Sequence, residues 1–204
     1  MKRIFYFLVI FTVCLTVIGC QTSTKKNGDD DADSQKIKDE VNDGNRGKDM
    51  NGIDIYEFAF IGKAPEAKEK HSLRKVIKVY FSDGSISEMN EVAIDVASKE
   101  IYKNPSMRNR GLRFNNGTIK FYEAEQVMEI LEKHEVQKWK RNYTFEDPTS
   151  YQDGYSCSLW LQYEDGTVQK YRGEGTDKDD ITPDNFDEFA ADLSNFVDER
   201  LGEK

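Results

Sequence analysis

Three side chains are of the types that metal and catalytic sites most often use: His71, His134 and Cys157. A zinc site needs three or four converging His, Cys or carboxylate ligands, and the spacing of these residues supplies no such set. Cys157 as a nucleophile would require a histidine such as His134 and an oxyanion environment. Its place in an alternating apolar segment is instead typical of a small core residue. We therefore expect no metal, no cofactor and no catalytic residue, and hence not an enzyme.

Acidic segments provide little further chemistry. Residues 47–53 resemble a calcium loop in part, but Gly47 and Phe58 stand where such a loop requires an acid and a bidentate glutamate. The acidic run at 177–180 is typical of a solvated loop. The chain contains neither a phosphate-binding glycine loop nor a G-x-S-x-G motif. Carboxylates are plentiful, so a glycosidase-like pair stays open.

Aromatic and cationic residues are the better candidates for recognition. The segment VQKWKRNY, taken as a strand, places Trp139, Arg141 and Tyr143 on one face. Trp160 points away from the apolar row of its own predicted strand, so it is expected on the sheet face opposite the helices. Exposed rings there would stack on sugar or on a partner chain. The alternative is cross-strand pairing that only stabilises the sheet.

A second candidate is the arginine cluster Arg108, Arg110 and Arg113, beside a glycine turn. Its charge opposes that of the whole chain, and it would hold an anionic wall polymer or a carboxylate. A solvated loop is the alternative.

The N-terminus indicates export. Lys2 and Arg3 precede an apolar run from Ile4 to Ile18, shorter than the ~20 residues of a spanning helix, which is typical of a signal peptide. The run ends in Val17-Ile18-Gly19-Cys20, which resembles the lipobox of bacterial lipoproteins. This resemblance implies that residues 1–19 are removed and that the Cys20 thiol carries a diacylglyceryl anchor in the cell membrane. An uncleaved anchor and a plain secreted protein are the alternatives.

The remaining chain divides at about residue 52. Residues 20–52 are polar and lack aromatic side chains, so they predict a disordered tether, followed by one globular domain over 53–204. Only Cys157 is left in that domain, so no disulfide forms within it. Removal of Lys2 and Arg3 takes the net charge from −9 to −11, which argues against a nucleic-acid partner.

Alternation and turn signals predict an antiparallel sheet. Two apolar runs lead into Asp83-Gly84 and Asp165-Gly166, which favours two β-hairpins. Apolar spacing predicts helices over 124–134 and after 182, with Thr182 as N-cap and Pro183 at the first helical position. Further strands are expected over 53–61, 91–102, 112–122 and 136–143. The predicted fold class is α+β, an antiparallel sheet with helices packed on one face in a two-layer sandwich.

The run from YQDGYSCSLW to AADLSNFV, about a quarter of the chain, resembles the C-terminal half of uncharacterised lipoprotein domains of low-GC Gram-positive bacteria. The residues that carry this resemblance are Asp153, Gly154, Leu159, Tyr163, Asp165, Gly166, Gly173, Pro183, Phe186 and Glu188. Cys157 departs from the pattern, which has Trp there. The resemblance implies a fold and no mechanism.

These features predict a lipid-anchored extracytoplasmic protein that binds an envelope protein or wall polymer through the exposed sheet face. An inhibitor or immunity-type protein and an enzyme acting on cell-wall material are the alternatives.

Overall fold

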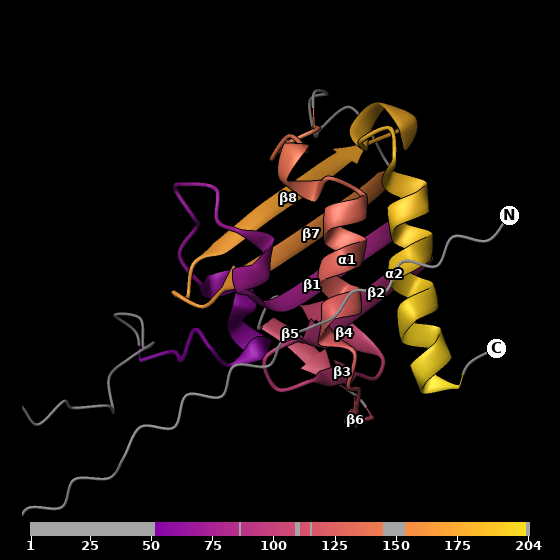
Figure 1. Ribbon diagram of the computed structural model, residues 1–204. Coiled ribbons are helices and arrows are strands. Elements are labelled where there is room, and N and C mark those ends of the chain that lie inside the picture. The colour runs from indigo at the N-terminus through magenta and orange to yellow at the C-terminus, as the bar shows by residue number, and fades with distance from the viewer. Residues whose placement is uncertain (1–51, 86, 109–110, 115, 145–153, 203–204) are drawn as a thin grey trace, which may run out of the picture. The chain divides into compact units, whose positions relative to one another are not determined.

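The computed structural model describes residues 52–85, 87–108, 111–114, 116–144 and 154–202 (Figure 1). The chain divides into a unit over residues 1–41 and a unit over residues 42–204, and every described residue belongs to the second. The lipidation predicted at Cys20, the signal peptide, nearly all of the tether, and Arg110 lie outside the described residues. None of the helices in the described ranges is long and apolar enough to cross a membrane.

A six-stranded sheet forms the centre of the described unit. Its strand order is β6-β3-β2-β1-β7-β8, and every neighbouring pair is antiparallel. A separate two-stranded sheet joins β4 to β5. The strands are β1 (Val76–Ser85), β2 (Met89–Asp95), β3 (Glu100–Tyr102), β4 (Pro105–Arg108), β5 (Gly111–Phe114), β6 (Thr118–Lys120), β7 (Tyr155–Tyr163) and β8 (Val168–Gly175).

Two helices, α1 (Ala124–Lys133) and α2 (Phe186–Leu201), lie side by side over one face of this sheet (Figure 1). The main core fills the space between helices and strands. Phe81 of β1 packs there against Phe186 and Phe189 of α2, with ring centroids 5.8 and 5.6 Å apart. The α+β fold class and the antiparallel sheet are thus confirmed.

The hairpin of β7 and β8 forms as predicted. Cys157, Leu159, Leu161 and Tyr163 alternate along β7 and are all buried in the main core. Gly166 sits in the turn with φ of 81°, a conformation that glycine adopts without steric cost. The turn fixes the register that pairs Trp160 with Lys170 across the two strands.

Two predicted strands, 53–61 and 136–143, are wrong. The first contains the start of a 3₁₀ helix, η2 (Phe58–Lys63), and the second begins with another, η4 (Val136–Lys138). In each, two large buried apolar residues stand three positions apart, Phe58 with Ile61 and Val136 with Trp139. Three residues make one turn of a 3₁₀ helix, so this spacing buries both side chains on one side.

Other boundaries also shift. The expected strands 91–102 and 112–122 each divide into two shorter strands. The first hairpin is closed by backbone hydrogen bonds between Ser85 and Glu88, beyond the predicted turn at Asp83-Gly84. Thr182 does not cap α2, because its hydroxyl donates backwards to the Lys178 carbonyl and the helix begins at Phe186.

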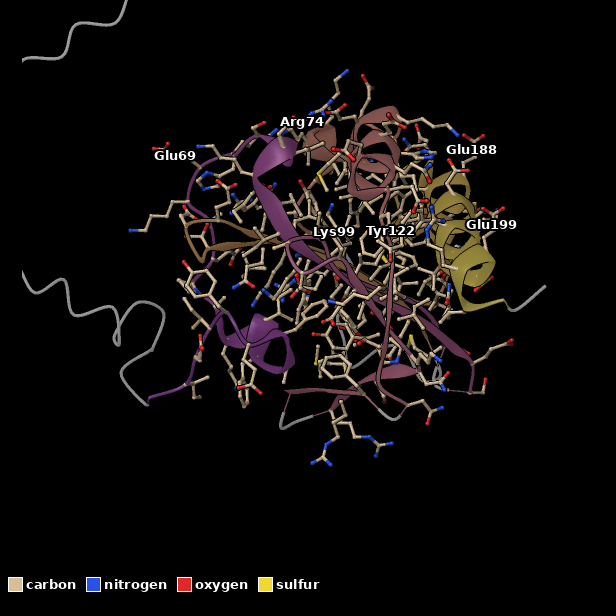
Figure 2. The ribbon with its side chains drawn as sticks, turned by 60° about the horizontal axis from the view of Figure 1, so that its bottom comes forward. Glu69, Arg74, Lys99, Tyr122, Glu188 and Glu199 are labelled. Atoms are coloured by element: carbon tan, nitrogen blue, oxygen red, sulfur yellow. The ribbon has the colours of Figure 1, made fainter. Side chains whose placement is uncertain are left out.

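The sheet face opposite α1 and α2 is partly covered, whereas the two-layer prediction left that face exposed. Helix η2 and the β4–β5 hairpin pack there in a second apolar cluster around Phe58, Ile61, Tyr80 and Leu112. Two short 3₁₀ helices, η3 (Leu73–Lys75) and η5 (Asp179–Ile181), complete the described elements. Charged side chains such as Glu69, Arg74, Glu188 and Glu199 lie at the periphery (Figure 2).

Candidate functional site

Trp139, predicted on an exposed strand face, is a core residue. It is 9% exposed, and its ring lies 5.0 Å from that of Phe189 in α2. Its indole N–H donates to Asn185 Oδ1 at 3.2 Å. Tyr143, expected on the same face, is half-buried at the edge of the same core. The shared face does not exist because the segment is not a strand.

The arginine cluster is only partly described. Arg108 and Arg113 are exposed on β4 and β5, where the register places both on one side of the hairpin. Neither forms an ion pair with another described residue.

Two other predicted residues, Trp160 and Arg141, do come together. They line a cleft of about 330 Å³ at the β8 edge of the sheet, on the face opposite the helices. We call it the β8 cleft. Its described lining residues are Glu66, Arg141, Asn142, Ser158, Trp160, Lys170 and Arg172.

The strand register explains why these side chains share one place. Side chains on one face of a strand repeat every two residues, so Trp160 and Ser158 of β7 point to the same side. Across the strand pair, Trp160 faces Lys170 and Ser158 faces Arg172. The prediction that Trp160 lies opposite the helix face is confirmed, since it packs against the second apolar cluster.

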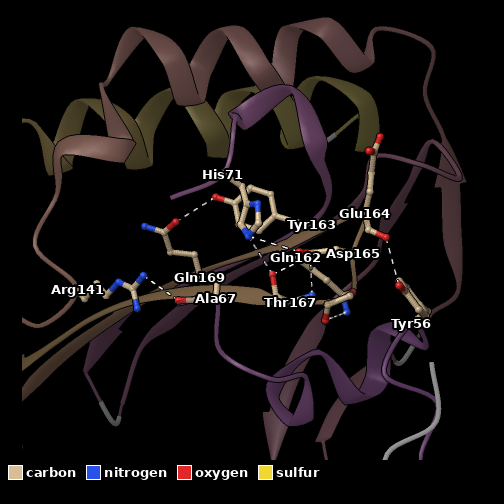
Figure 3. Close-up of polar contacts among 11 residues, drawn as sticks. Tyr56, Ala67, His71, Arg141, Gln162, Tyr163, Glu164, Asp165, Thr167 and Gln169 are labelled. Carbon is tan, nitrogen blue, oxygen red and sulfur yellow. Dashed lines mark hydrogen bonds and ion pairs between the residues drawn. The ribbon is translucent and has the colours of Figure 1, made fainter. Parts of the chain in front are cut away.

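Arg141 forms the outer wall of the cleft. Its guanidinium donates to the Ala67 carbonyl at 2.8 Å (Figure 3) and pairs with Glu66 at 3.3 Å. The backbone of Arg141 is also hydrogen-bonded to β8: its carbonyl accepts from Arg172 N–H at 3.1 Å. Arg141 therefore joins two distant segments at the sheet edge and holds the wall in place.

Lys170 lies inside the cleft, half-buried. Its ammonium donates to the Gly62 carbonyl at 2.9 Å and sits 5.1 Å from the Trp160 ring centroid. Burial lowers the pKa of Lys170 below its ordinary value, and the positive charges of Lys63 and Arg172 act in the same direction, against the opposing effect of Glu66. The surroundings of the Lys170 ammonium therefore do not fully offset the cost of burying its positive charge.

Gly62 fits closely against the indole. A Cβ added at this glycine would lie 2.8 Å from Trp160 Cζ3. The Trp160 ring also packs against Tyr80, with the two ring centroids 5.1 Å apart. The aromatic wall of the cleft is thus rigidly supported.

The outer part of the cleft holds Arg172, Asn142 and Ser158. Arg172 is exposed and forms no ion pair with any other described residue. The Asn142 Oδ1 atom accepts from Thr144 N–H at 3.1 Å, and its NH₂ group donates to no other described residue. Counting Arg141, Lys170 and Arg172 against Glu66, the lining carries a net charge of +2, in a chain of net charge −9.

The histidines and the cysteine lie elsewhere. His71 Nε2 is 3.5 Å from both Asp165 Oδ2 and Thr167 Oγ1 (Figure 3). A triad needs carboxylate and hydroxyl on opposite ring nitrogens, and Thr167 donates directly to Asp165 at 2.8 Å. This cluster therefore closes the β7–β8 turn. Cys157 is buried, which raises the pKa of its thiol to about 12. Within the described ranges, no group of His, Cys, Asp and Glu is placed to hold a metal ion.

Sequence reasoning missed Lys170 and Arg172, although a signal was present. Once the Asp165-Gly166 turn is assigned, residue pairing across the hairpin puts Lys170 opposite Trp160. Glu66 and Asn142 carried no such local signal.

No family model, curated protein or solved structure matches this chain. The two resemblances noted in the sequence therefore stay predictions.

Proposed function

We propose that this protein is a lipid-anchored extracytoplasmic binding domain, and that the β8 cleft binds its ligand at the cell envelope. The anchor is the diacylglyceryl group on Cys20, and the ligand is an envelope protein or wall polymer. The cleft acts without catalysis.

The observation that carries the binding site is the charge of the cleft. A lining of net charge +2, with an exposed and unpaired arginine among the described residues, stands in a chain of net charge −9. Burial of the Lys170 ammonium also disfavours its charged form, since the group it donates to is a neutral carbonyl. Positive charge of this kind beside a fixed aromatic ring is typical of recognition of an anionic ligand.

Charge reversal at matched arginines tests this site. Arg172 in the cleft and Arg113 outside it are both exposed and form no ion pair with another described residue. Sedimentation of the unlipidated mature chain with native envelopes measures binding. Arg172→Glu lowers retention about tenfold or more, as expected for loss of a charge-assisted contact, and Arg113→Glu leaves it within twofold of wild type. Equal retention of both variants contradicts the proposed site.

The anchor is tested on native material. Mass spectrometry of the N-terminal peptide is expected to show Cys20 as the first residue with a diacylglyceryl adduct, and Cys20→Ala to abolish it. A native peptide with Met1 still attached, or with residue 20 unmodified, would contradict the proposed lipid anchor.

A further inference from the structure

We propose that the group held in the β8 cleft is a phosphate carried by a sugar or polyol. This rests on the proposed function of the same cleft and adds the chemical class of the ligand. Membrane phospholipid and carboxylated sugar are the competing classes, and the experiment below separates them.

The first support is the hydrogen-bonding character of the lining. Arg172, Lys170 and Asn142 present N–H donors, and Ser158 adds a hydroxyl. Among the described lining residues, the one carboxylate belongs to Glu66, which is already paired with Arg141 at 3.3 Å. A site built from donors suits a group with several acceptor oxygens and no proton to give.

The second support is the charge balance. The Arg141–Glu66 pair cancels, which leaves the two positive charges of Lys170 and Arg172. A phosphate monoester carries about −1.5 to −2 at pH 7, so one such group, or two neighbouring phosphodiesters, neutralises both. A single carboxylate neutralises one and leaves the other uncompensated.

The geometry of the two cations favours the same group. The Arg172 guanidinium is a planar fork that matches two phosphate oxygens, and it is exposed at the mouth of the cleft. Lys170 approaches from the inner side as a point charge, with its ammonium on the Gly62 carbonyl at 2.9 Å. Its ammonium keeps two further N–H groups for an anion, which would offset the cost of burying the charge.

Trp160 and the shape of the cleft indicate what carries the phosphate. The indole lines the cleft together with both cations, and its ring centroid lies 5.1 Å from the Lys170 ammonium. An apolar ring there suits the C–H face of a sugar. The site is a recess of about 330 Å³. A free or polymer-borne phosphate can enter such a recess. A lipid headgroup is held in the plane of a bilayer, which disfavours its entry.

Calorimetric titration of the full mature protein in detergent micelles tests the class. The probes are glucose 1-phosphate, inorganic phosphate, a glycerol phosphate polymer, glucuronate, glucose, and phosphatidylglycerol added to the micelles. Glucose 1-phosphate or the polymer is expected to bind about tenfold more tightly than glucuronate, and more tightly than inorganic phosphate. Glucose shows no binding, and phosphatidylglycerol does not compete.

Variants locate the bound phosphate. Arg172→Gln and Lys170→Met each weaken glucose 1-phosphate binding about tenfold or more, while Arg113→Gln stays within twofold of wild type. Arg172 is exposed, so its variant keeps the fold, and the urea midpoint checks this. Loss of binding in Arg113→Gln alone would place the phosphate elsewhere.

Three results overturn the inference: equal binding of glucuronate and glucose 1-phosphate, displacement by phosphatidylglycerol, or no binding of any phosphate probe. If envelope retention still depends on Arg172 while all phosphates fail, the binding site stands and its ligand class is wrong. If glucose 1-phosphate binds through Arg172 but envelope retention does not depend on it, the phosphate site stands and the envelope function is wrong.

Discussion

The two faces of the six-stranded sheet are built from alternate residues of the same strands, yet they differ in chemistry. On the helix face, Leu159 and Leu161 of β7 are almost fully buried beneath α1 and α2. On the opposite face, Ser158 and Trp160 stay half-buried and share their surface with Lys170. The first face is a mainly apolar core that provides stability. The second keeps polar groups accessible, which is what binding requires.

The two tryptophans give the largest test of this difference. Trp139→Ala removes a core ring that contacts Phe189 and Tyr171, so the free energy of unfolding is expected to fall by about 3–5 kcal/mol. Trp160→Ala removes a half-buried ring and is expected to cost about 1–2 kcal/mol. Urea denaturation measures both.

The same pair separates stability from binding. Trp160→Ala is expected to lower envelope retention while the protein stays folded. Similar losses of stability in the two variants would show that the faces are not distinct.

A substitution at Gly62 changes the sheet face opposite the helices without removing a side chain that could bind the ligand. In Gly62→Ala the new methyl would lie 2.8 Å from Trp160 Cζ3, so overpacking is expected to cost about 1–3 kcal/mol and to displace the indole. The double variant Gly62→Ala with Trp160→Ala should cost less than the sum of the single changes. Strict additivity in urea denaturation would mean that the glycine and the ring do not contact each other.

The smallest expected effect concerns a charge on the helix face. Burial raises the pKa of Asp83 above 3.8, more than the attraction of Lys178 lowers it. Stability is therefore lost as pH rises from 3.8 through the native pKa, and the cost persists at neutral pH. Asp83→Asn should raise Tm by about 2 °C at pH 7, and the gain should vanish near pH 3.5.

The matched control for Asp83 is Asp187→Asn. Asp187 is exposed and forms an ion pair with Lys178, and its charge also raises the pKa of Asp83. Its replacement loses the ion pair but relieves a repulsion, so Tm at pH 7 should change less than in Asp83→Asn. A gain in Asp187→Asn equal to that in Asp83→Asn would assign the effect to net charge instead of burial.

Local patterns predicted the parts of the fold that depend on neighbours in sequence. The Asp165-Gly166 turn and the alternation of β7 sufficed to place Trp160 on the face away from the helices. Strands 53–61 and 136–143 failed because short apolar segments fit a strand and a 3₁₀ helix alike. Tertiary burial of Val136 and Trp139 decided between them.

The site was harder to predict than the sheet. Arg141 reaches the cleft because Asn142 pairs in parallel with Arg172 of β8, and Glu66 arrives through a second parallel bridge to Val168. Both contacts join segments far apart in sequence, and no turn or periodic pattern marks them. Lys170 and Arg172, by contrast, were missed although the hairpin register places them opposite Trp160 and Ser158.

The most direct test of the β8 cleft as the ligand site is photocrosslinking in intact cells. A photoactivatable residue replaces Ser158, which lines the cleft, or Glu188, which is exposed on α2 (Figure 2). We predict a covalent adduct to an envelope component from position 158 and none from position 188. Adducts from position 188 alone, or from neither position, would contradict the cleft as the binding site.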